Sequence, residues 1–264
     1  MELESILLIA LAAFVMATMY SAVGHGGGSG YLAILALAAI APEQMRPTAL
    51  LLNVVVACIA TWKFTSPRRF RKDIFLPLVC ASIPAAFVGG AFELPPQIYK
   101  PLLGVILLYA AIRLCTPIKG CEKTKKPAMF LIVAVGVCIG FVSGAIGIGG
   151  GIFLSPLILL FGWTTAKQTA AISAPFILLN SIAGIGGITF DFGGLPVNTQ
   201  LVAPLLVAVV IGGYVGATFG SKKLGHAGLR AALGIVLLIA AGKMLLTSES
   251  AVNQEAPNEI KYTQ

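Results

Sequence analysis

The sequences GHGGGSG at residues 24–30 and GIGGGIF at residues 147–153 each interrupt an apolar stretch with three consecutive glycines. A glycine inside a helix costs about 1 kcal/mol relative to alanine, so three together predict a break in the helix. Unwound backbone within a bilayer is stable only where protein or water covers it. Because Gly26 and Gly149 lie 123 positions apart in matching contexts, the two breaks predict one enclosed site in a duplicated membrane protein.

The composition is that of an integral membrane protein. Of 264 residues, 58% are hydrophobic and 11% are charged, and a soluble domain with these values would expose large apolar patches. The apolar stretches are about as long as membrane-spanning helices and lack the alternation of barrel strands, which predicts an all-α polytopic fold. The net charge of +8 comes mainly from short loops and helix ends, so no nucleic-acid partner is expected. Basic residues near helix ends, such as Arg46, are expected to snorkel to the membrane surface.

Ten apolar segments can be drawn along the chain, which predicts about eight to ten membrane segments. The second and the seventh are too short to cross a bilayer comfortably. The segments are 5–23, 30–41, 46–63, 74–92, 99–115, 128–146, 152–162, 168–189, 200–219 and 227–246.

The duplication extends well beyond the glycines. LLLN at 50–53 matches ILLN at 177–180, and LGVILLYAAIRL at 103–114 matches LGIVLLIAAGKM at 233–244. The offsets grow in order along the chain, which indicates small insertions in the second copy. We therefore expect a first repeat over 1–115, a linker over 116–127, a second repeat over 128–247 and a polar tail over 248–264.

The distribution of basic residues predicts that the two repeats have opposite orientations. The most basic connections are 65–73 and 116–127, and basic loops face the cytoplasm. In the second repeat the counterpart of 65–73 is 189–198, which has no basic residue, whereas 220–228 is basic. The bias has changed sides, so we expect inverted repeats, a cytoplasmic linker and both termini outside, in a multi-pass membrane protein.

The glycine breaks are the candidate substrate site. Half-helices that begin at a break direct free N–H groups and the positive end of the helix dipole toward an anion. The alternative is that the glycines only allow close helix packing, which accounts poorly for three in succession. All ten acidic residues fall in loops, helix ends or tails, so no midplane carboxylate is available for a cation. The predicted donors are Gly26, Gly27, Gly28, Gly149, Gly150 and Gly151.

Five polar residues extend this candidate site. His25 lies inside the first break, where it is either a hydrogen-bonded packing group or a group that titrates during transport. Asn53 and Asn180 occupy equivalent positions in apolar helices and serve either as links between helices or as substrate contacts. Ser29 and Ser155 could donate to an oxyanion, although serine often bonds to its own helix.

Signatures of catalysis and of cofactor binding were not found. The chain has no HExxH, GxSxG or Walker-type motif, and its five cysteines form no CxxC pair. We therefore expect no enzymatic activity, no cofactor and no metal.

The doubled GxGGG break, with GIGGGIFLSP at 147–156 and SPLILLFGW at 155–163, resembles the sulfite exporter family of the TauE/SafE type, also described as toluene-sulfonate uptake permeases. The likeness extends to about Leu246. The first copy differs, since it has His25, and Tyr31-Leu32-Ala33 where a proline is expected.

This resemblance implies a bacterial or archaeal inner-membrane carrier that moves small sulfur-containing anions, such as sulfite, sulfonates or sulfoacetate, usually outward. The residues themselves support only a small anion moved by alternating access between the repeats. Two other interpretations stay open, namely a passive anion channel and an integral-membrane enzyme or assembly factor of sulfur metabolism. The sequence also leaves open whether the chain forms a homodimer.

Overall fold

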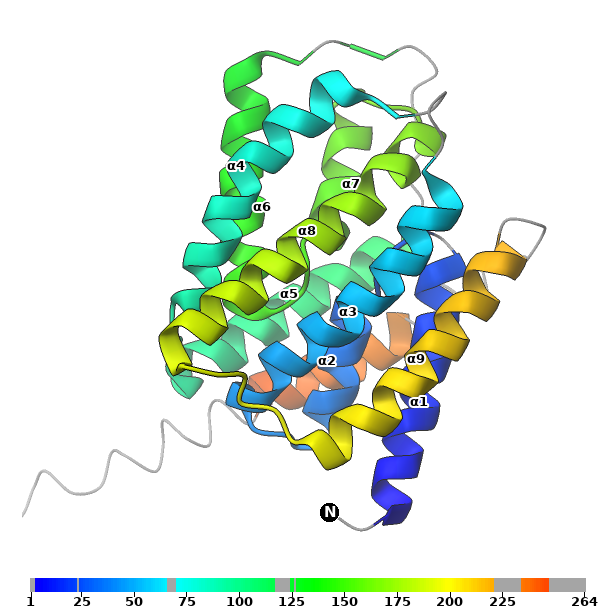
Figure 1. Cartoon of the computed structure of the whole chain (residues 1–264), viewed down its shortest axis with the longest axis vertical. Helices are drawn as coiled ribbons and strands as arrows, with labels where there is room; N and C mark the ends of the chain where they lie inside the picture. The colour runs from blue at the N-terminus through cyan, green and yellow to red at the C-terminus, as the bar shows by residue number, and fades with distance from the viewer. Residues whose placement is uncertain are drawn as a thin grey trace, which may run out of the picture.

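The computed structural model describes residues 3–22, 24–65, 70–116, 124–125, 127–220 and 234–246, and all regular structure in these ranges is α-helical (Figure 1). The predicted all-α polytopic fold is confirmed. Within the described residues, α1, α3, α4, α6, α8 and α9 are long and apolar enough to cross a membrane. The helices are α1 (Leu3–Ala22), α2 (Gly28–Leu37), α3 (Pro42–Phe64), α4 (Lys72–Ala91), α5 (Pro96–Cys115), α6 (Met129–Ile146), α7 (Gly151–Leu160), α8 (Ala166–Phe192) and α9 (Thr199–Gly220), followed by the helical segment Gly234–Leu246.

Local sequence signals explain where several helices begin. Pro42 and Pro96 occupy the first positions of α3 and α5, where a missing N–H costs nothing. A capping box precedes α8, in which the Thr165 hydroxyl accepts from the Gln168 backbone N–H and the Gln168 side chain accepts from the Thr165 backbone N–H. The predicted tail 248–264 and most of the linker 116–127 and of the basic loop 220–228 lie outside the described residues.

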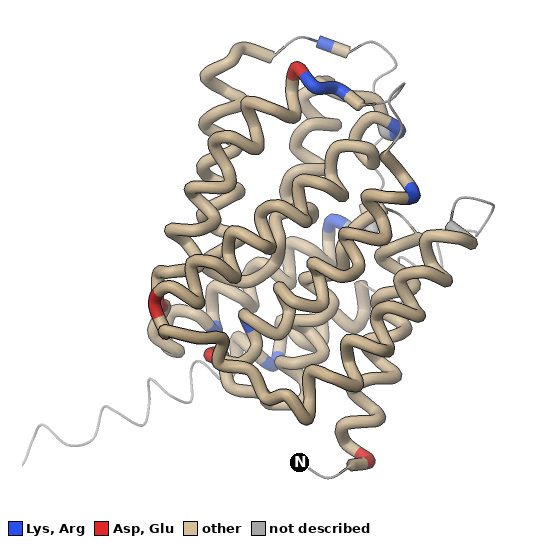
Figure 2. The backbone as a smooth tube through the Cα atoms, in the orientation of Figure 1, with Lys and Arg blue, Asp and Glu red and all other residues tan. Residues whose placement is uncertain are grey.

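The outer surface of the long helices is apolar. Leu8 of α1, Phe130 of α6 and Val207 of α9 are 69%, 71% and 61% exposed, far more than a protein in water tolerates over so large an area. Figure 2 shows uncharged residues along most of each helix, and most charged residues lie toward the two ends of the molecule. This surface is suited to contact with lipid chains.

The two halves are related as inverted repeats. In Figure 1, α1 rises from the N-terminus at the foot of the molecule whereas its counterpart α6 descends, and α4 and α9 also run in opposite directions. The helices exchange partners between the halves, since α4 packs along α6 and α9 packs along α1. A Cβ at Gly89 of α4 would collide with the carbonyl oxygen of Phe141, and a Cβ at Gly216 of α9 would collide with that of Thr18. These two contacts join positions that correspond at the repeat offsets, as a two-fold relation requires.

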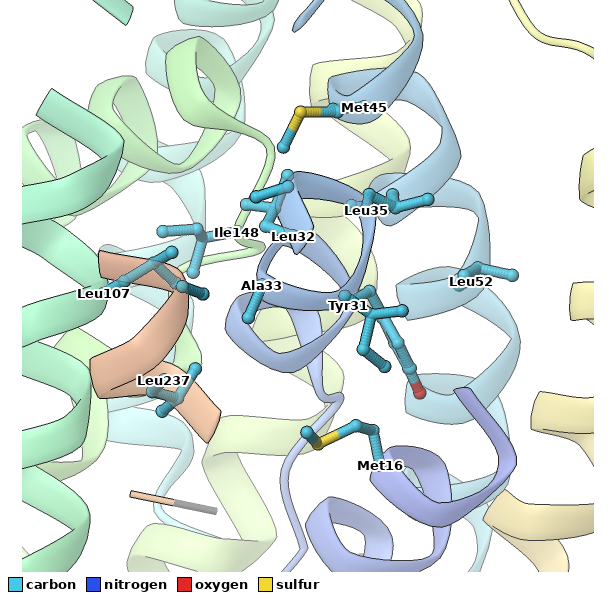
Figure 3. Packing of buried hydrophobic residues seen from close by; sticks show 14 of the residues in the cluster. Met16, Tyr31, Leu32, Ala33, Leu35, Met45, Leu52, Leu107, Ile148 and Leu237 are labelled. Atoms are coloured by element: carbon cyan, nitrogen blue, oxygen red, sulfur yellow. The ribbon is translucent and has the colours of Figure 1, made fainter. Parts of the chain in front are cut away.

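The short helices α2 and α7 lie inside the bundle and have 10 residues each. Tyr31, Leu32 and Leu35 of α2 are at most 1% exposed, and Figure 3 shows α2 surrounded by apolar side chains that include Met16 of α1 and Leu52 of α3. The two predicted short segments are therefore confirmed as helices too short to span a bilayer.

Candidate functional site

Both short helices begin at a left-handed glycine. Gly27, with φ 97°, immediately precedes α2, and Gly150, with φ 79°, immediately precedes α7. Only glycine adopts this conformation without a steric penalty, which explains why the helices break here. The first four N–H groups of any helix lack partners within that helix. The backbone around Gly28 and Gly151 therefore presents hydrogen-bond donors and the positive ends of two helix dipoles.

The two breaks lie against each other in the centre of the molecule. A Cβ at Gly28 would collide with the carbonyl oxygen of Ile148, and a Cβ at Gly151 would lie 3.9 Å from Cδ2 of His25. Segments that are 123 positions apart in the chain thus form one surface, because only bare backbone allows so close an approach.

Asn53 of α3 joins the two breaks. Its Nδ2 donates to the carbonyl oxygen of Ile148 at 2.8 Å and to Ser181 Oγ at 3.4 Å. A Cβ at either Gly26 or Gly149 would collide with this amide. The side chain is fully buried, and within the described residues its Oδ1 has no hydrogen-bond partner. That oxygen can accept one hydrogen bond from a bound water or ligand.

Asn180, the counterpart of Asn53, behaves differently. Its Nδ2 donates to the carbonyl oxygen of Phe176, one turn earlier in its own helix, at 2.8 Å. It is equally buried, and its Oδ1 also lacks a partner among the described residues. The equivalent asparagines are thus a link between helices in the first repeat and a self-bonded residue in the second.

A small pocket lies where the breaks meet. Its free space for the centre of a water-sized sphere is about 10 Å³, roughly what one water molecule requires. Within the described part of the chain, none of the residues that line it is acidic. They are Tyr20, His25, Gly26, Gly27, Gly28, Ser29, Asn53, Ile148, Gly151, Ile152 and Ile177.

Seven of the predicted site residues line this pocket, and four do not. Gly149 and Gly150 form the second break behind it, whereas Asn180 and Ser155 lie away from its wall. The Ser155 hydroxyl pairs with that of Ser173 at 2.9 Å, which links α7 to α8. Ser155 therefore has a polar partner of its own within the bundle.

Sequence reasoning missed Tyr20 and the three isoleucines of the pocket wall. The Tyr20 hydroxyl pairs with Ser29 Oγ at 2.9 Å and so ties the end of α1 to the first turn of α2. The signal available was its position four residues before the first glycine of the break, one helical turn away. The isoleucines carry no such signal, because apolar residues are everywhere in this chain.

Arg46 corrects one expectation. It does not snorkel to the surface but is 5% exposed, and its Nη2 donates to the carbonyl oxygens of Gly89, Gly90 and Gly144 at 3.3, 3.0 and 3.4 Å. The sequence places it near a helix end, yet α4 and α6 cover that end and supply carbonyl partners.

Among the described residues, no group of three or more His, Cys, Asp or Glu side chains could hold a metal ion.

Comparisons with known proteins agree with this architecture. A family model described as "Sulfite exporter TauE/SafE" matches residues 9–244. A protein of Sinorhizobium fredii named "Probable membrane transporter protein y4hK" is 38% identical over 244 residues, which cover 90% of this chain and 97% of that protein. A "Probable membrane transporter protein" of Haemophilus influenzae is 26% identical over 216 residues, which cover 76% of this chain and 80% of that one. No solved structure matches the chain significantly.

Proposed function

The chain belongs to the sulfite exporter TauE/SafE family of membrane transporters, and on that premise we propose that it is a secondary carrier of small sulfur-containing anions such as sulfite, sulfonates or sulfoacetate. The observation that carries the proposal is the meeting of two helix N-termini, at Gly28 and Gly151, around a pocket whose described wall contains no acidic residue. Export is the direction that the family name indicates.

Helix dipoles and free N–H groups account for the choice of an anion. Each N-terminus carries about half a positive charge, and its unpaired N–H groups point at the space in front of the helix. Two such ends facing one pocket can bind an oxyanion without a fully charged partner. An uncharged donor set also suits a carrier, because the anion must leave as readily as it enters.

The size of the pocket supports alternating access over a permanent channel. Space for about one water is too small for sulfite, which has four heavy atoms. In this proposal the two inverted repeats move relative to each other, so that the site opens and closes on one side at a time. A passive channel would need a continuous path wide enough for its ion.

The charge distribution supports an orientation. Lys63 at the end of α3, Arg71 and Lys72 at the start of α4, and Lys125 before α6 lie on the end of the molecule where α4 and α6 begin in Figure 1. Glu4 at the start of α1 lies at the opposite end. By the bias of basic residues toward the cytoplasm, we propose that the N-terminus lies outside. The inner membrane is the location that the family resemblance implies. Homodimerisation stays a prediction.

Flux through proteoliposomes tests the proposal. We expect sulfite counterflow with the wild-type protein, loss of flux in the variants Gly27→Leu and Gly150→Leu, and unchanged flux in the matched control Gly194→Leu, whose Cβ would meet open space. Normal flux in both break variants at normal expression would remove the glycines from the mechanism. Uptake without exchange stimulation would favour a channel, and chemical conversion of sulfite would favour an enzyme.

A further inference from the structure

The second break creates an electrostatic problem for an anion site. Helix α6 ends at Ile146, immediately before the break. Its last carbonyl oxygens therefore lie next to the pocket whose wall includes the first residues of α7. The C-terminal end of a helix carries about half a negative charge, and its last four carbonyls lack partners within the helix. Left bare, these carbonyls would repel the anion that the α7 N–H groups attract.

Side chains from the first repeat donate to two of these carbonyls and to one carbonyl of the break. The donors reach three alternate positions along the end of α6 and the break. The bonds are Arg46 Nη2 to Gly144 O at 3.4 Å, Tyr99 Oη to Ile146 O at 3.1 Å, and Asn53 Nδ2 to Ile148 O at 2.8 Å. Arg46 and Tyr99 were not predicted as site residues and do not line the pocket.

Arg46 brings a full positive charge to the ends of two helices. Its Nη2 also donates to the carbonyl oxygens of Gly89 and Gly90, in the last turn of α4, which ends at Ala91. The backbone of Arg46 lies against the break itself, because a Cβ at Gly147 would be 3.0 Å from Cα of Arg46. One guanidinium charge thus faces two half-negative helix ends, which is close to complete compensation.

The first break has no such arrangement among the described residues. At the repeat offset of 127, the counterpart of Arg46 is Ser173, whose hydroxyl pairs with Ser155. The counterpart of Asn53 is Asn180, which bonds to its own helix. Within the part of the chain that the structure describes, the guanidinium arrangement is thus found at the second break, and the equivalent serine and asparagine of the other half bond locally instead.

We propose that Arg46, supported by Tyr99, is a positioning residue for the anion site. It neutralises the C-terminal ends of α4 and α6 and, with Tyr99, fixes carbonyls in the last turn of α6, so that the N–H groups of α7 dominate the potential in the pocket. It acts through this backbone and does not touch the ligand. This inference rests on the proposed function, because it assumes that the pocket receives an anion.

Nearby carboxylates do not replace this role. Glu43 and Glu93 line a second pocket beside Arg46 and Tyr99, but both are exposed. Solvent screens exposed charges strongly, so the buried guanidinium controls the field on the inner side of α3.

The charge selectivity of thiol labelling tests the inference without a transport substrate. Ile152→Cys, in the pocket wall, is placed in a background without the five native cysteines, and Ser29→Cys serves as a second reporter. Labelling rates are measured with a sulfonate-bearing and an ammonium-bearing methanethiosulfonate, both of which are larger than the closed pocket and therefore react while the site is open to one side of the membrane. Their ratio cancels changes in thiol reactivity and in access, because both reagents need the same thiolate and have similar size.

We expect Arg46→Met to lower the anionic-to-cationic rate ratio about 100-fold at both reporters, and Arg46→Lys to keep it near the wild-type value. A unit charge acting over roughly 12 Å at an effective dielectric constant near 20 changes each rate by about tenfold, in opposite directions for the two reagents, so their ratio changes by the square of that factor. An unchanged ratio in Arg46→Met would overturn the inference, even if both rates change together. Should Arg46→Met fail to fold, Arg46→Gln gives the same comparison with a side chain that still donates hydrogen bonds.

Sulfite counterflow in the same proteins separates this result from the proposed function. If Arg46→Met lowers the labelling ratio but the protein with Arg46 in place does not transport sulfite, the proposed substrate is refuted and the electrostatic role is supported. Sulfite transport together with an unchanged ratio would support the carrier and reject the role of Arg46.

Discussion

Replacing Asn53 and Asn180 by alanine should have unequal effects, although the two residues are equivalent in sequence. Asn53→Ala leaves the carbonyl oxygen of Ile148 without its 2.8 Å partner in a fully buried position, which costs about 1–3 kcal/mol. Asn180→Ala removes a bond to a carbonyl that belongs to its own helix, and removal of a buried, unpartnered Oδ1 is common to both variants. Both changes delete the same volume, so the cost of the cavity is similar in the two variants.

Unfolding by SDS in mixed micelles measures this difference. We expect Asn53→Ala to lower the free energy of unfolding by about 1–3 kcal/mol more than Asn180→Ala does. Because the lost bond holds the second break against the first, the dissociation constant for sulfite should rise by roughly 5- to 150-fold in Asn53→Ala alone. Equal stability losses in the two variants, or a larger loss for Asn180→Ala, would refute the link that we assign to Asn53.

Two further predictions concern glycines. Gly27→Ala and Gly150→Ala, at φ 97° and 79°, should each lose about 1–2 kcal/mol of stability from the left-handed backbone alone, whereas Gly194→Ala, with open space around it, should stay near the wild type in the same SDS titration. Gly89→Ala and Gly216→Ala should each cost about 1–3 kcal/mol by overpacking, since the added Cβ collides with a carbonyl oxygen of the facing helix. A thermal unfolding temperature that is normal in one variant and strongly lowered in the other would contradict the inverted-repeat relation.

The helices and the breaks could be predicted from sequence because they depend on local chemistry. The expected segment 152–162 corresponds to α7 at Gly151–Leu160, and 30–41 corresponds to α2 at Gly28–Leu37. Three consecutive glycines mark both breaks, whereas the glycine pair Gly89-Gly90 stays helical within α4, and apolar length decides which helices can cross a bilayer. The repeat offsets then identified which segments correspond between the halves.

The contacts of individual polar side chains could not be predicted in this way. LLLN and ILLN are nearly identical, yet Asn53 reaches across to the other repeat and Asn180 does not. Arg46 looks like a residue that snorkels, because the carbonyls that bury it come from α4 and α6, about 40 and 100 positions further along the chain. Such partners are set by tertiary packing and leave no pattern in a single sequence.

The most direct test of the central claim is an NMR titration of glycine-labelled protein with sulfite. If the N–H groups at the start of α2 and α7 bind the anion, the amide resonances of Gly28 and Gly151 should shift downfield and saturate together, while that of Gly194 stays constant. Saturable sulfite binding that leaves the Gly28 and Gly151 resonances unmoved would contradict the account.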